Sequence, residues 1–308
     1  MSKVLALLVL FLAACRSVAA GSADGPHLLV LGVAQDGGHP QAGCEAACCA
    51  DACEDPRLGH RVTCLALVDP ERRRFWLVEA TPDFPRQLRQ VHELHPGFAL
   101  AGIFITHAHI GHYAGLAHLG REVMGTPAVP VCARPRLARF LSSNGPWSQL
   151  VQLRNIELRE LAANERVELA PGLAVTPFLV PHRDEFSETA GFRIDGPVRS
   201  ALFVPDIDKW ERWERDVRDA VRSVDLAFVD GTFFRDGELA RDMREVPHPF
   251  VEETLRRFAD APAEERAKLV FLHLNHTNPL LDPNSTAARA VAAHGAHVAR
   301  ELDVFPLD

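Results

Sequence analysis

The sequence predicts an α/β (α+β) fold built as a single domain, and three observations support this class. Of the 308 residues, 47% are hydrophobic, which is enough apolar material for one large core. Short apolar runs typical of buried strands occur in groups, with segments of helical periodicity between them. Several of these strands end in histidine or aspartate. Residue types that bind metals, placed at several strand ends, indicate one shared site.

The charge balance argues against a nucleic-acid-binding protein. The chain has 33 Lys plus Arg against 41 Asp plus Glu, a net charge of −8, and no basic stripe with interleaved aromatic residues. Fifteen histidines against one tyrosine give weak support to metal chemistry. We therefore expect a small-molecule substrate and no nucleic-acid partner.

Residues 1–20 are predicted to be an export signal. The apolar run 4–14 is too short to span a bilayer, which needs about 20 residues. It ends at Cys15 in a context that resembles a bacterial lipobox, in which the cysteine is lipidated and becomes the new N-terminus. Ordinary cleavage after residues 18–20 is the alternative. We expect an exported, periplasmic lipoprotein of a bacterium, held to the membrane through Cys15.

The domain is predicted to occupy residues 26–308 and to begin with a strand at His27–Val33. A Gly- and Cys-rich loop follows at 35–60, and a loop of this length needs something to order it. Its four cysteines lie close together: Cys44, Cys48, Cys49 and Cys53. They either close a structural zinc site, although the spacing is not the common one, or form disulfides in an oxidising compartment. The sequence favours neither interpretation.

Two strands and a helix are predicted next. The strands are Val62–Val68 and Phe75–Glu79, and the helix opens near Asp83 and stops before Pro96. Glu79 and Asp83 stand just ahead of a histidine-rich segment, so either of them can orient a ligand histidine through a hydrogen bond. An ordinary helix cap is the alternative role for Asp83.

The segment GIFITHAHIGHYAGL, residues 102–116, carries the strongest signal in the chain. A buried strand stops at Thr106, and three histidines follow within six residues: His107, His109 and His112. In extended backbone the first two leave the same face of the chain, and the third arrives one turn later as a helix begins. This convergence suits zinc, iron or manganese, and a histidine-rich surface turn is the alternative.

Strands and helices continue to alternate after this turn. We expect a helix at Tyr113–Met124, a strand at Pro130–Ala133, a helix at Pro135–Ser143, and later strands that include Val175–Val180, Leu226–Val229 and Leu269–Leu272. Polar residues stand at four further strand ends: His182, Asp206, Asp230, and the pair His273 and His276. We expect them to join the first three histidines in one site. Capping of a following helix is the alternative role for Asp206.

These residues resemble the metallo-β-lactamase superfamily along the chain from about His27 onward. The H-x-H-x-D-H turn of that superfamily matches HAHIGH at 107–112. The resemblance implies an αββα sandwich with the site along one edge between two sheets. It also implies six metal ligands, of which Asp206 and His273 serve catalysis: His107, His109, His112, His182, Asp206 and His273. The segment VDGTF resembles the ribonuclease Z and phosphodiesterase branch. VAQDGGHPQAGC and HLNHTNPLL resemble the pyrroloquinoline-quinone biosynthesis B family more closely.

One position departs from the superfamily pattern. The acidic residue of the turn is Gly111 here, and glycine has no ligand atom. The second metal position would keep only His112, His273 and the shared Asp206. The departure predicts one ion or a loosely filled second position, unless Asp230 or His276 fills the vacancy. Zinc is expected, as one or two ions. Iron and manganese remain candidates because two histidines and one carboxylate also suit non-haem iron.

The leading function predicted from the sequence is that of a metal-dependent hydrolase. Metal-activated water, oriented by Asp206, would attack an ester, lactone, amide or phosphodiester. The alternatives are a non-haem iron oxygenase-type enzyme related to pyrroloquinoline-quinone biosynthesis, and a non-catalytic periplasmic binding or carrier protein on the same fold.

Overall fold

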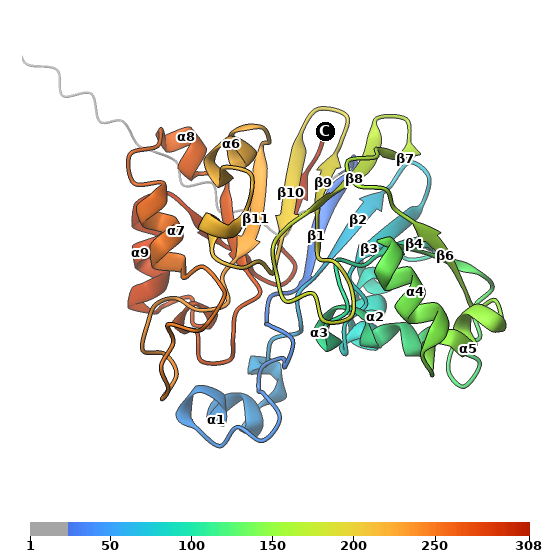
Figure 1. Cartoon of the computed structure of the whole chain (residues 1–308), viewed down its shortest axis with the longest axis horizontal. Helices are drawn as coiled ribbons and strands as arrows, with labels where there is room; N and C mark the ends of the chain where they lie inside the picture. The colour runs from blue at the N-terminus through green and yellow to red at the C-terminus, as the bar shows by residue number, and fades with distance from the viewer. Residues whose placement is uncertain (1–23) are drawn as a thin grey trace, which may run out of the picture.

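Residues 24–308, which this computed structural model describes, form two seven-stranded sheets that pack face to face, with helices on both outer faces (Figure 1). This is the αββα sandwich that the resemblance implies. The expected export signal, 1–20, and the expected lipidation site, Cys15, lie outside the described residues.

The first sheet begins with an antiparallel meander and continues with parallel strands. β1, β2 and β3 pair antiparallel, and β3 to β6 run parallel. The strands, in sheet order, are β14 (Val304–Pro306), β1 (His27–Gly32), β2 (Cys64–Asp69), β3 (Arg74–Val78), β4 (Ala99–Phe104), β5 (Val129–Ala133) and β6 (Ile156–Glu160).

The second sheet has the same arrangement along the chain. β7 to β10 pair antiparallel, and β10 to β13 run parallel. The strands, in sheet order, are β13 (His297–Val298), β12 (Leu269–Leu272), β11 (Leu226–Asp230), β10 (Ser200–Val204), β9 (Ala190–Asp195), β8 (Leu173–Leu179) and β7 (Val167–Ala170).

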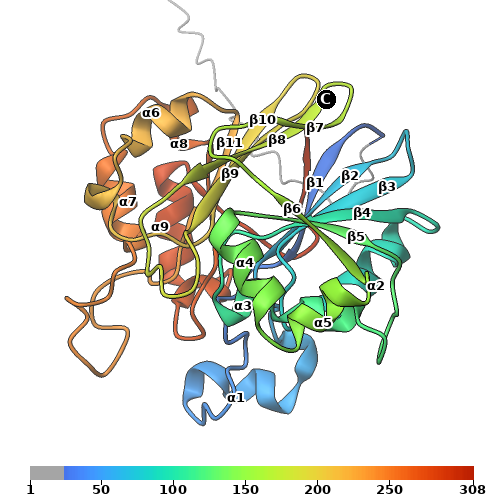
Figure 2. The ribbon, with the colours of Figure 1, turned by 45° about the vertical axis from the view of Figure 1, so that its right-hand side comes forward.

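Helices cover each sheet on the side that faces away from the other sheet. Figure 2 shows α2 to α5 beside the first sheet and α6 to α9 beside the second. The helices are α1 (Ala47–Glu54), α2 (Phe84–Leu94), α3 (Ile110–Tyr113), α4 (Pro135–Ser143), α5 (Trp147–Gln152), α6 (Val217–Arg222), α7 (Val251–Arg257), α8 (Ala263–Arg266) and α9 (Thr286–His294). Four 3₁₀ turns complete the set: η1 (Pro56–Leu58), η2 (Ala114–Leu119), η3 (Trp210–Arg212) and η4 (Pro279–Leu281). Within residues 24–308, no helix has the length and apolar character needed to cross a membrane.

Packing on both faces of the strands explains why their sequences are continuous apolar runs. Along β1, Leu28 and Val30 pack between the sheets, whereas Leu29 and Leu31 pack against the helices of the outer layer. Both faces of the strand are therefore buried, and alternation with polar residues is lost.

The Cys-rich loop, 35–60, contains the short elements α1 and η1 and leaves the sandwich at one edge (Figure 1). The prediction of a loop without secondary structure was therefore incomplete. The strand Leu269–Leu272 and the helix Pro135–Ser143 are confirmed with their predicted bounds.

The helix predicted at Tyr113–Met124 is wrong. The chain forms only α3 and η2 there. The backbone of Ala80 explains the break, because its N–H donates to the His112 carbonyl at 2.9 Å and its carbonyl accepts from Gly115 N at 2.8 Å. These bonds tie the turn to the end of β3. The helix expected after Asp206 is interrupted, since the three-residue η3 comes first and α6 begins only at Val217.

Candidate metal centre

The first donor group contains His107, His109, His182 and Asp206, whose ligand atoms all lie within 4.8 Å of one another. His182 Nε2 is 3.2 Å from Asp206 Oδ2 and 3.3 Å from His109 Nδ1. His107 Nε2 is 2.8 Å from His109 Nδ1 and 3.4 Å from Asp206 Oδ2. Ligands about 2.0 Å from a tetrahedral ion lie about 3.3 Å apart, so this set fits zinc.

The second donor group contains Asp36, His112, Asp206 and His273, again within 4.8 Å. Asp36 Oδ1 is 3.0 Å from His112 Nε2 and 3.3 Å from His273 Nε2. Asp206 Oδ2, which contacts the first group, is 3.8 Å from His112 Nε2 and can be shared by two ions. The predicted shortage of ligands in this group is therefore wrong. Asp36, which the sequence analysis missed, brings the second carboxylate.

In His107 and His112, the ring nitrogen that does not face the donor groups, Nδ1, contacts a buried oxygen atom. Glu79, fully buried, lies 3.1 Å from His112 Nδ1 through its Oε1 and accepts the Thr106 hydroxyl proton at 2.6 Å. Because that proton is used, Thr106 Oγ1 accepts from His107 Nδ1, at 2.8 Å. Both imidazoles then present Nε2 to the donor groups. Glu79 thus has the contact expected from the sequence.

His109 and His273 have partners of the same kind, and His182 Nδ1 has a carboxylate close by. His182 Nδ1 lies 3.3 Å from Asp208 Oδ1, and His109 Nε2 lies 2.9 Å from Glu185 Oε2. His273 Nδ1 lies 3.0 Å from the hydroxyl of Thr232, which donates its proton to Asp230. Such partners fix the orientation and tautomer of a ligand imidazole and raise its basicity. The contacts of Asp208, Glu185 and Thr232 were not predicted.

The charges of the site suit cations. Burial opposes the charged form of Asp206, but His182 and then His248 outweigh it and hold the pKa of Asp206 well below its usual range. Burial also opposes ionisation of Asp36, but His112 and His273 hold its pKa well below normal. His112 Nε2 and Asp206 Oδ1 are buried and have no hydrogen-bond partner among residues 24–308. Buried anions beside unpartnered donor atoms fit a site built for divalent metal.

The backbone is strained at two residues of the centre. Glu79 has φ 86° and His273 has φ 63°, and neither is glycine. Such conformations cost about 1–3 kcal/mol each and persist only where the surroundings impose them. At Glu79 the strained backbone places the side chain against a ligand histidine. At His273 it places the side chain among the donor atoms.

His248, like Asp36, is a residue of the site that sequence reasoning missed. Its Nδ1 lies 2.9 Å from Asp230 Oδ2 and 3.3 Å from Asp206 Oδ1. Asp230 therefore does not complete the second donor group. It also accepts from Thr232 and from Ile207 N, so it organises the strand ends around His248. His248 lies in a loop whose sequence carries no strand or motif signal. Only the proline before it, as before His182, could have suggested it.

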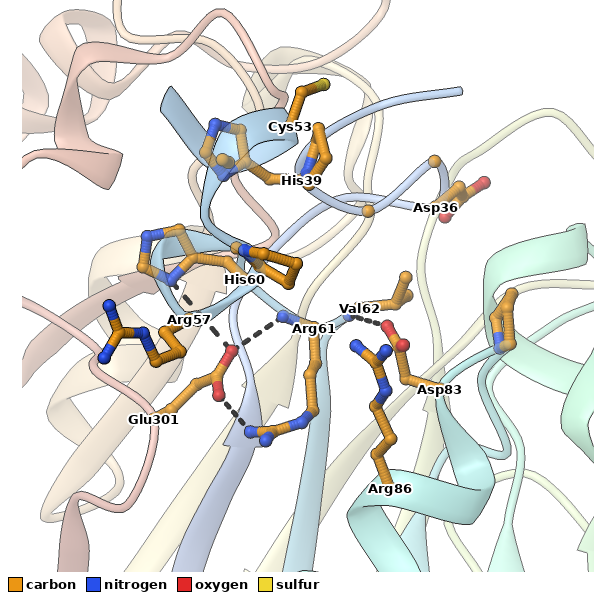
Figure 3. A pocket seen from close by; sticks show the side chains of 17 residues that line it. Asp36, His39, Cys53, Arg57, His60, Arg61, Val62, Asp83, Arg86 and Glu301 are labelled. Atoms are coloured by element: carbon orange, nitrogen blue, oxygen red, sulfur yellow. Dashed lines mark hydrogen bonds and ion pairs between the residues drawn. The ribbon is translucent and has the colours of Figure 1, made fainter. Parts of the chain in front are cut away.

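Asp83 does not reach the metal centre. Its carboxylate accepts from Val62 N at 2.9 Å, and it makes no side-chain cap for α2 (Figure 3). Both proposed roles for Asp83 are therefore wrong, since the residue secures the return of the Cys-rich loop into β2.

A separate donor group lies in the Cys-rich loop and contains Cys44, Cys48, Cys49 and His276. Cys44 and Cys48 Sγ are 3.7 Å apart, and His276 Nδ1 is 3.6 Å from Cys48 Sγ and 3.4 Å from Cys49 Sγ. A tetrahedral zinc ion with ligands at about 2.3 Å (S) and 2.0 Å (N) requires separations of about 3.8 Å between two sulfurs and about 3.5 Å between sulfur and nitrogen. Within residues 24–308 every cysteine is free, which favours the zinc interpretation over disulfides.

Two residues therefore belong to other groups than the sequence analysis predicted. Cys53 is exposed and lies outside the Cys/His group, and His276 belongs to that group rather than to the main centre. We call Cys44, Cys48, Cys49 and His276 the Cys/His cluster.

A cavity of about 760 Å³ lies beside the main centre, with His248 in its wall. Gln35 and Asn275 line it next to the donor groups, and Asn275 Nδ2 donates to Gln35 Oε1 at 3.0 Å. Phe233 and Arg183 also line it. None of the residues of the first and second donor groups lines the cavity, but His248 in its wall contacts Asp206, so a small molecule held there lies next to the donor groups.

Comparison with known proteins agrees with this architecture. A β-lactamase superfamily domain matches residues 74–274, so the chain belongs to the metallo-β-lactamase superfamily. Within it, the chain groups with coenzyme PQQ synthesis protein B. The protein of that name from Methylobacterium nodulans is 31% identical over 301 residues, 89% of this chain and 97% of the relative. The one from Methylobacterium sp. strain 4-46 is 30% identical over the same lengths.

Solved structures show the same fold. Zn²⁺-bound PqqB from Methylobacterium extorquens superposes with a TM-score of 0.75 and 25% identity, covering 91% of this chain and all of that one. A diphosphatase of the PhnP family has a TM-score of 0.61 at 21% identity and covers 90% of this chain and 94% of its own. Human tRNase Z, short form, has a TM-score of 0.54 at 15% identity, with 92% and 99% covered.

Proposed function

We propose that this protein is a metal-dependent hydrolase of a small molecule. The observation that carries the proposal is His248, which lies in the wall of the cavity of about 760 Å³ and whose Nδ1 is 2.9 Å from Asp230 and 3.3 Å from Asp206, a member of both donor groups. A binding protein needs ligands for metal, whereas a carboxylate-held histidine at the cavity wall is a device for proton transfer.

Zinc is the proposed ion, because both donor groups have its ligand types and spacing and because the PqqB structure from M. extorquens is zinc-bound. His107, His109 and His182 would hold one ion and Asp36, His112 and His273 the other, with Asp206 between them. Zinc, when bound, lowers the pKa of water toward neutrality and polarises a carbonyl or phosphoryl oxygen.

The residues of the chain have separate tasks in this proposal. Asp206 Oδ2 lies among the donor atoms and orients the attacking water, while its Oδ1 faces His248 at 3.3 Å. Burial opposes the charged form of His248, but Asp230 and then Asp206 outweigh it and raise its pKa, so the imidazolium donates Nδ1–H to Asp230 and can pass its Nε2 proton to the leaving group. Gln35 and Asn275 position the substrate through their amides. Ester, lactone, amide and phosphodiester groups all fit these roles, and a β-lactam is not favoured.

The test is hydrolysis of a panel of these four bond types by the zinc-loaded protein. We expect turnover of at least one class, and a His248→Gln variant should lose about 10²–10⁴-fold in kcat with unchanged zinc content. His92→Gln, at an exposed position of α2, is the matched control and should behave as the native protein. Full activity in His248→Gln would refute its role. No turnover of any class by fully loaded protein would favour a binding or carrier protein.

A second candidate is a step in the synthesis of coenzyme PQQ, supported by 31% identity over nearly the whole of a relative with that name. The second donor group has two histidines and two carboxylates, and two histidines with one carboxylate also suit the non-haem iron of an oxygenase. Complementation of a bacterial strain that lacks the PQQ synthesis protein B tests the pathway. Oxygen consumption by the iron-loaded protein tests the chemistry. Failure of both removes this candidate.

We also propose that the protein is exported and held to the membrane through Cys15. The support is the sequence of residues 1–20 alone.

A further inference from the structure

We propose that Asp36 is the carboxylate ligand of a second divalent cation, replacing the acidic residue that the superfamily turn carries at position 111, and that Gly111 is there to make room for it. The proposal concerns metal binding and is independent of the reaction that the site performs.

The contacts of Asp36 are those of a ligand. Its Oδ1 lies 3.0 Å from His112 Nε2 and 3.3 Å from His273 Nε2. His112 Nε2 is buried and has no hydrogen-bond partner within residues 24–308. The two imidazoles keep Nδ1 bonded to Glu79 and Thr232, so the nitrogens that face Asp36 are the ones free to bind metal.

Asp36 lies so close to position 111 that only glycine fits there. A Cβ atom at position 111 would lie 2.4 Å from Asp36 Oδ1, 2.7 Å from its Cγ and 2.5 Å from its Cα. Gly111 is helical and its φ is outside the left-handed region, so backbone conformation is not the reason for glycine. The reason is space. An aspartate at 111 and an aspartate at 36 exclude each other.

The fold ties Asp36 to the strand end that carries His273. Leu274, next to His273, forms backbone hydrogen bonds of 2.8 Å to Val33 and to Gln35, on either side of the bridge with Ala34. These bonds hold Asp36 near the end of β12, and not with the part of the Cys-rich loop that leaves the sandwich.

Figure 3 shows Asp36 at the rim of a neighbouring pocket of about 590 Å³, with its carboxylate turned away from the Arg61–Glu301 ion pair. Among the described residues, its carboxylate contacts only the imidazoles of the second donor group. Within residues 24–308, no lysine or arginine side chain forms an ion pair with the Asp36 carboxylate.

The experiment compares metal content and affinity in three proteins: native, Asp36→Asn and Gly111→Ala. Each is stripped with a chelator, dialysed and titrated with Zn²⁺ by calorimetry, and metal is counted by mass spectrometry. Asp36→Asn keeps the shape but removes the anionic ligand, so it should bind one ion fewer or bind that ion about 100-fold or more weakly. Gly111→Ala removes no ligand atom, yet it should lose the same ion because it displaces Asp36.

The controls separate this loss from general damage. Asp51→Asn removes an exposed carboxylate of α1, and Gly145→Ala adds a Cβ where no atom lies within 4 Å. Both should keep the native count. A His109→Ala variant should lose the ion of the first donor group and keep that of the second. The Cys/His cluster is common to all these proteins and cancels from the differences.

The proposal is overturned if Asp36→Asn binds as many ions as the native protein with the same affinity. It is also overturned if the native protein binds a single ion in the two donor groups together. Should Gly111→Ala fail to fold, the Asp36→Asn comparison decides alone, because an isosteric amide at the rim of a pocket leaves the packing intact.

Discussion

Replacing Glu79 with glutamine tests whether a residue that touches no metal ligand atom controls metal binding. Glu79 is fully buried, and its Oε1 receives hydrogen bonds from Thr106 Oγ1 at 2.6 Å and from His112 Nδ1 at 3.1 Å. Its Oε2 accepts from Thr106 N at 3.2 Å. The carboxylate therefore accepts three donors, and every one of them belongs to the turn that carries the ligand histidines.

An amide cannot accept all three. If the side-chain oxygen of the Glu79→Gln variant keeps the place of Oε1, its NH₂ group faces Thr106 N–H and two buried donors confront each other. If the amide is reversed, the NH₂ group faces Thr106 Oγ1 and His112 Nδ1, and the tautomers of the histidines change. The first arrangement leaves a buried donor unsatisfied, which costs about 1–3 kcal/mol of folding stability. The second moves the imidazole protons to the Nε2 atoms that face the donor groups, where they oppose metal binding.

The effect on metal affinity adds to this. Loss of an outer carboxylate contact weakens metal binding by about 10–100-fold, or about 1.4–2.7 kcal/mol. We expect this loss at the second donor group of Glu79→Gln, where His112 is a ligand. Calorimetric titration of the metal-free protein with Zn²⁺ measures the affinity, and urea unfolding of the metal-free form measures the stability.

The matched control is Glu185→Gln. Glu185 contacts His109 Nε2 at 2.9 Å, but its side chain is 48% exposed, so water replaces the lost contact. We expect less than about a threefold change there. Zinc affinity of Glu79→Gln within twofold of the native value would refute the reasoning that this buried carboxylate tunes the centre.

Three further predictions concern regions outside the main centre. A Cys15→Ser variant should move from the membrane to the soluble fraction, and native protein recovered wholly in the soluble periplasmic fraction would contradict the anchor. His276→Ala should bind one zinc fewer than the native protein, whereas Cys53→Ser should keep the native count by mass spectrometry. Burial, followed by nearby positive charge, lowers the pKa of His60 from 6.5 to about 4. The unfolded chain therefore takes up this proton first, and the fold should lose stability as pH falls from 6.5 toward 4. The loss is at most about 3 kcal/mol, and about 1–2 after solvent screening. His60→Gln should flatten this part of the urea-midpoint profile, and an unchanged profile would contradict the assignment.

Local patterns in the sequence were sufficient for most of the fold. The strand Leu269–Leu272 and the helix Pro135–Ser143 were predicted with their observed bounds, because a buried apolar run and a Pro-initiated amphipathic segment are signals carried by neighbouring residues. Helix length was predicted less well. The segment after His112 has helical periodicity but is broken by backbone contacts with Ala80, which follows β3 much earlier in the chain.

The sequence by itself also determined where the metal centre lies and most of its histidines, since those residues follow strands at fixed, local spacing. Only the tertiary structure decided how the donor groups are completed. Asp36 and His273 meet across 237 positions of the sequence, and Cys48 and His276 across 228. No spacing rule reaches over such distances. A carboxylate missing at Gly111 can be supplied by any segment that the fold brings to the same point, and the bridge between Ala34, which follows β1, and Leu274, which follows β12, brings Asp36 there.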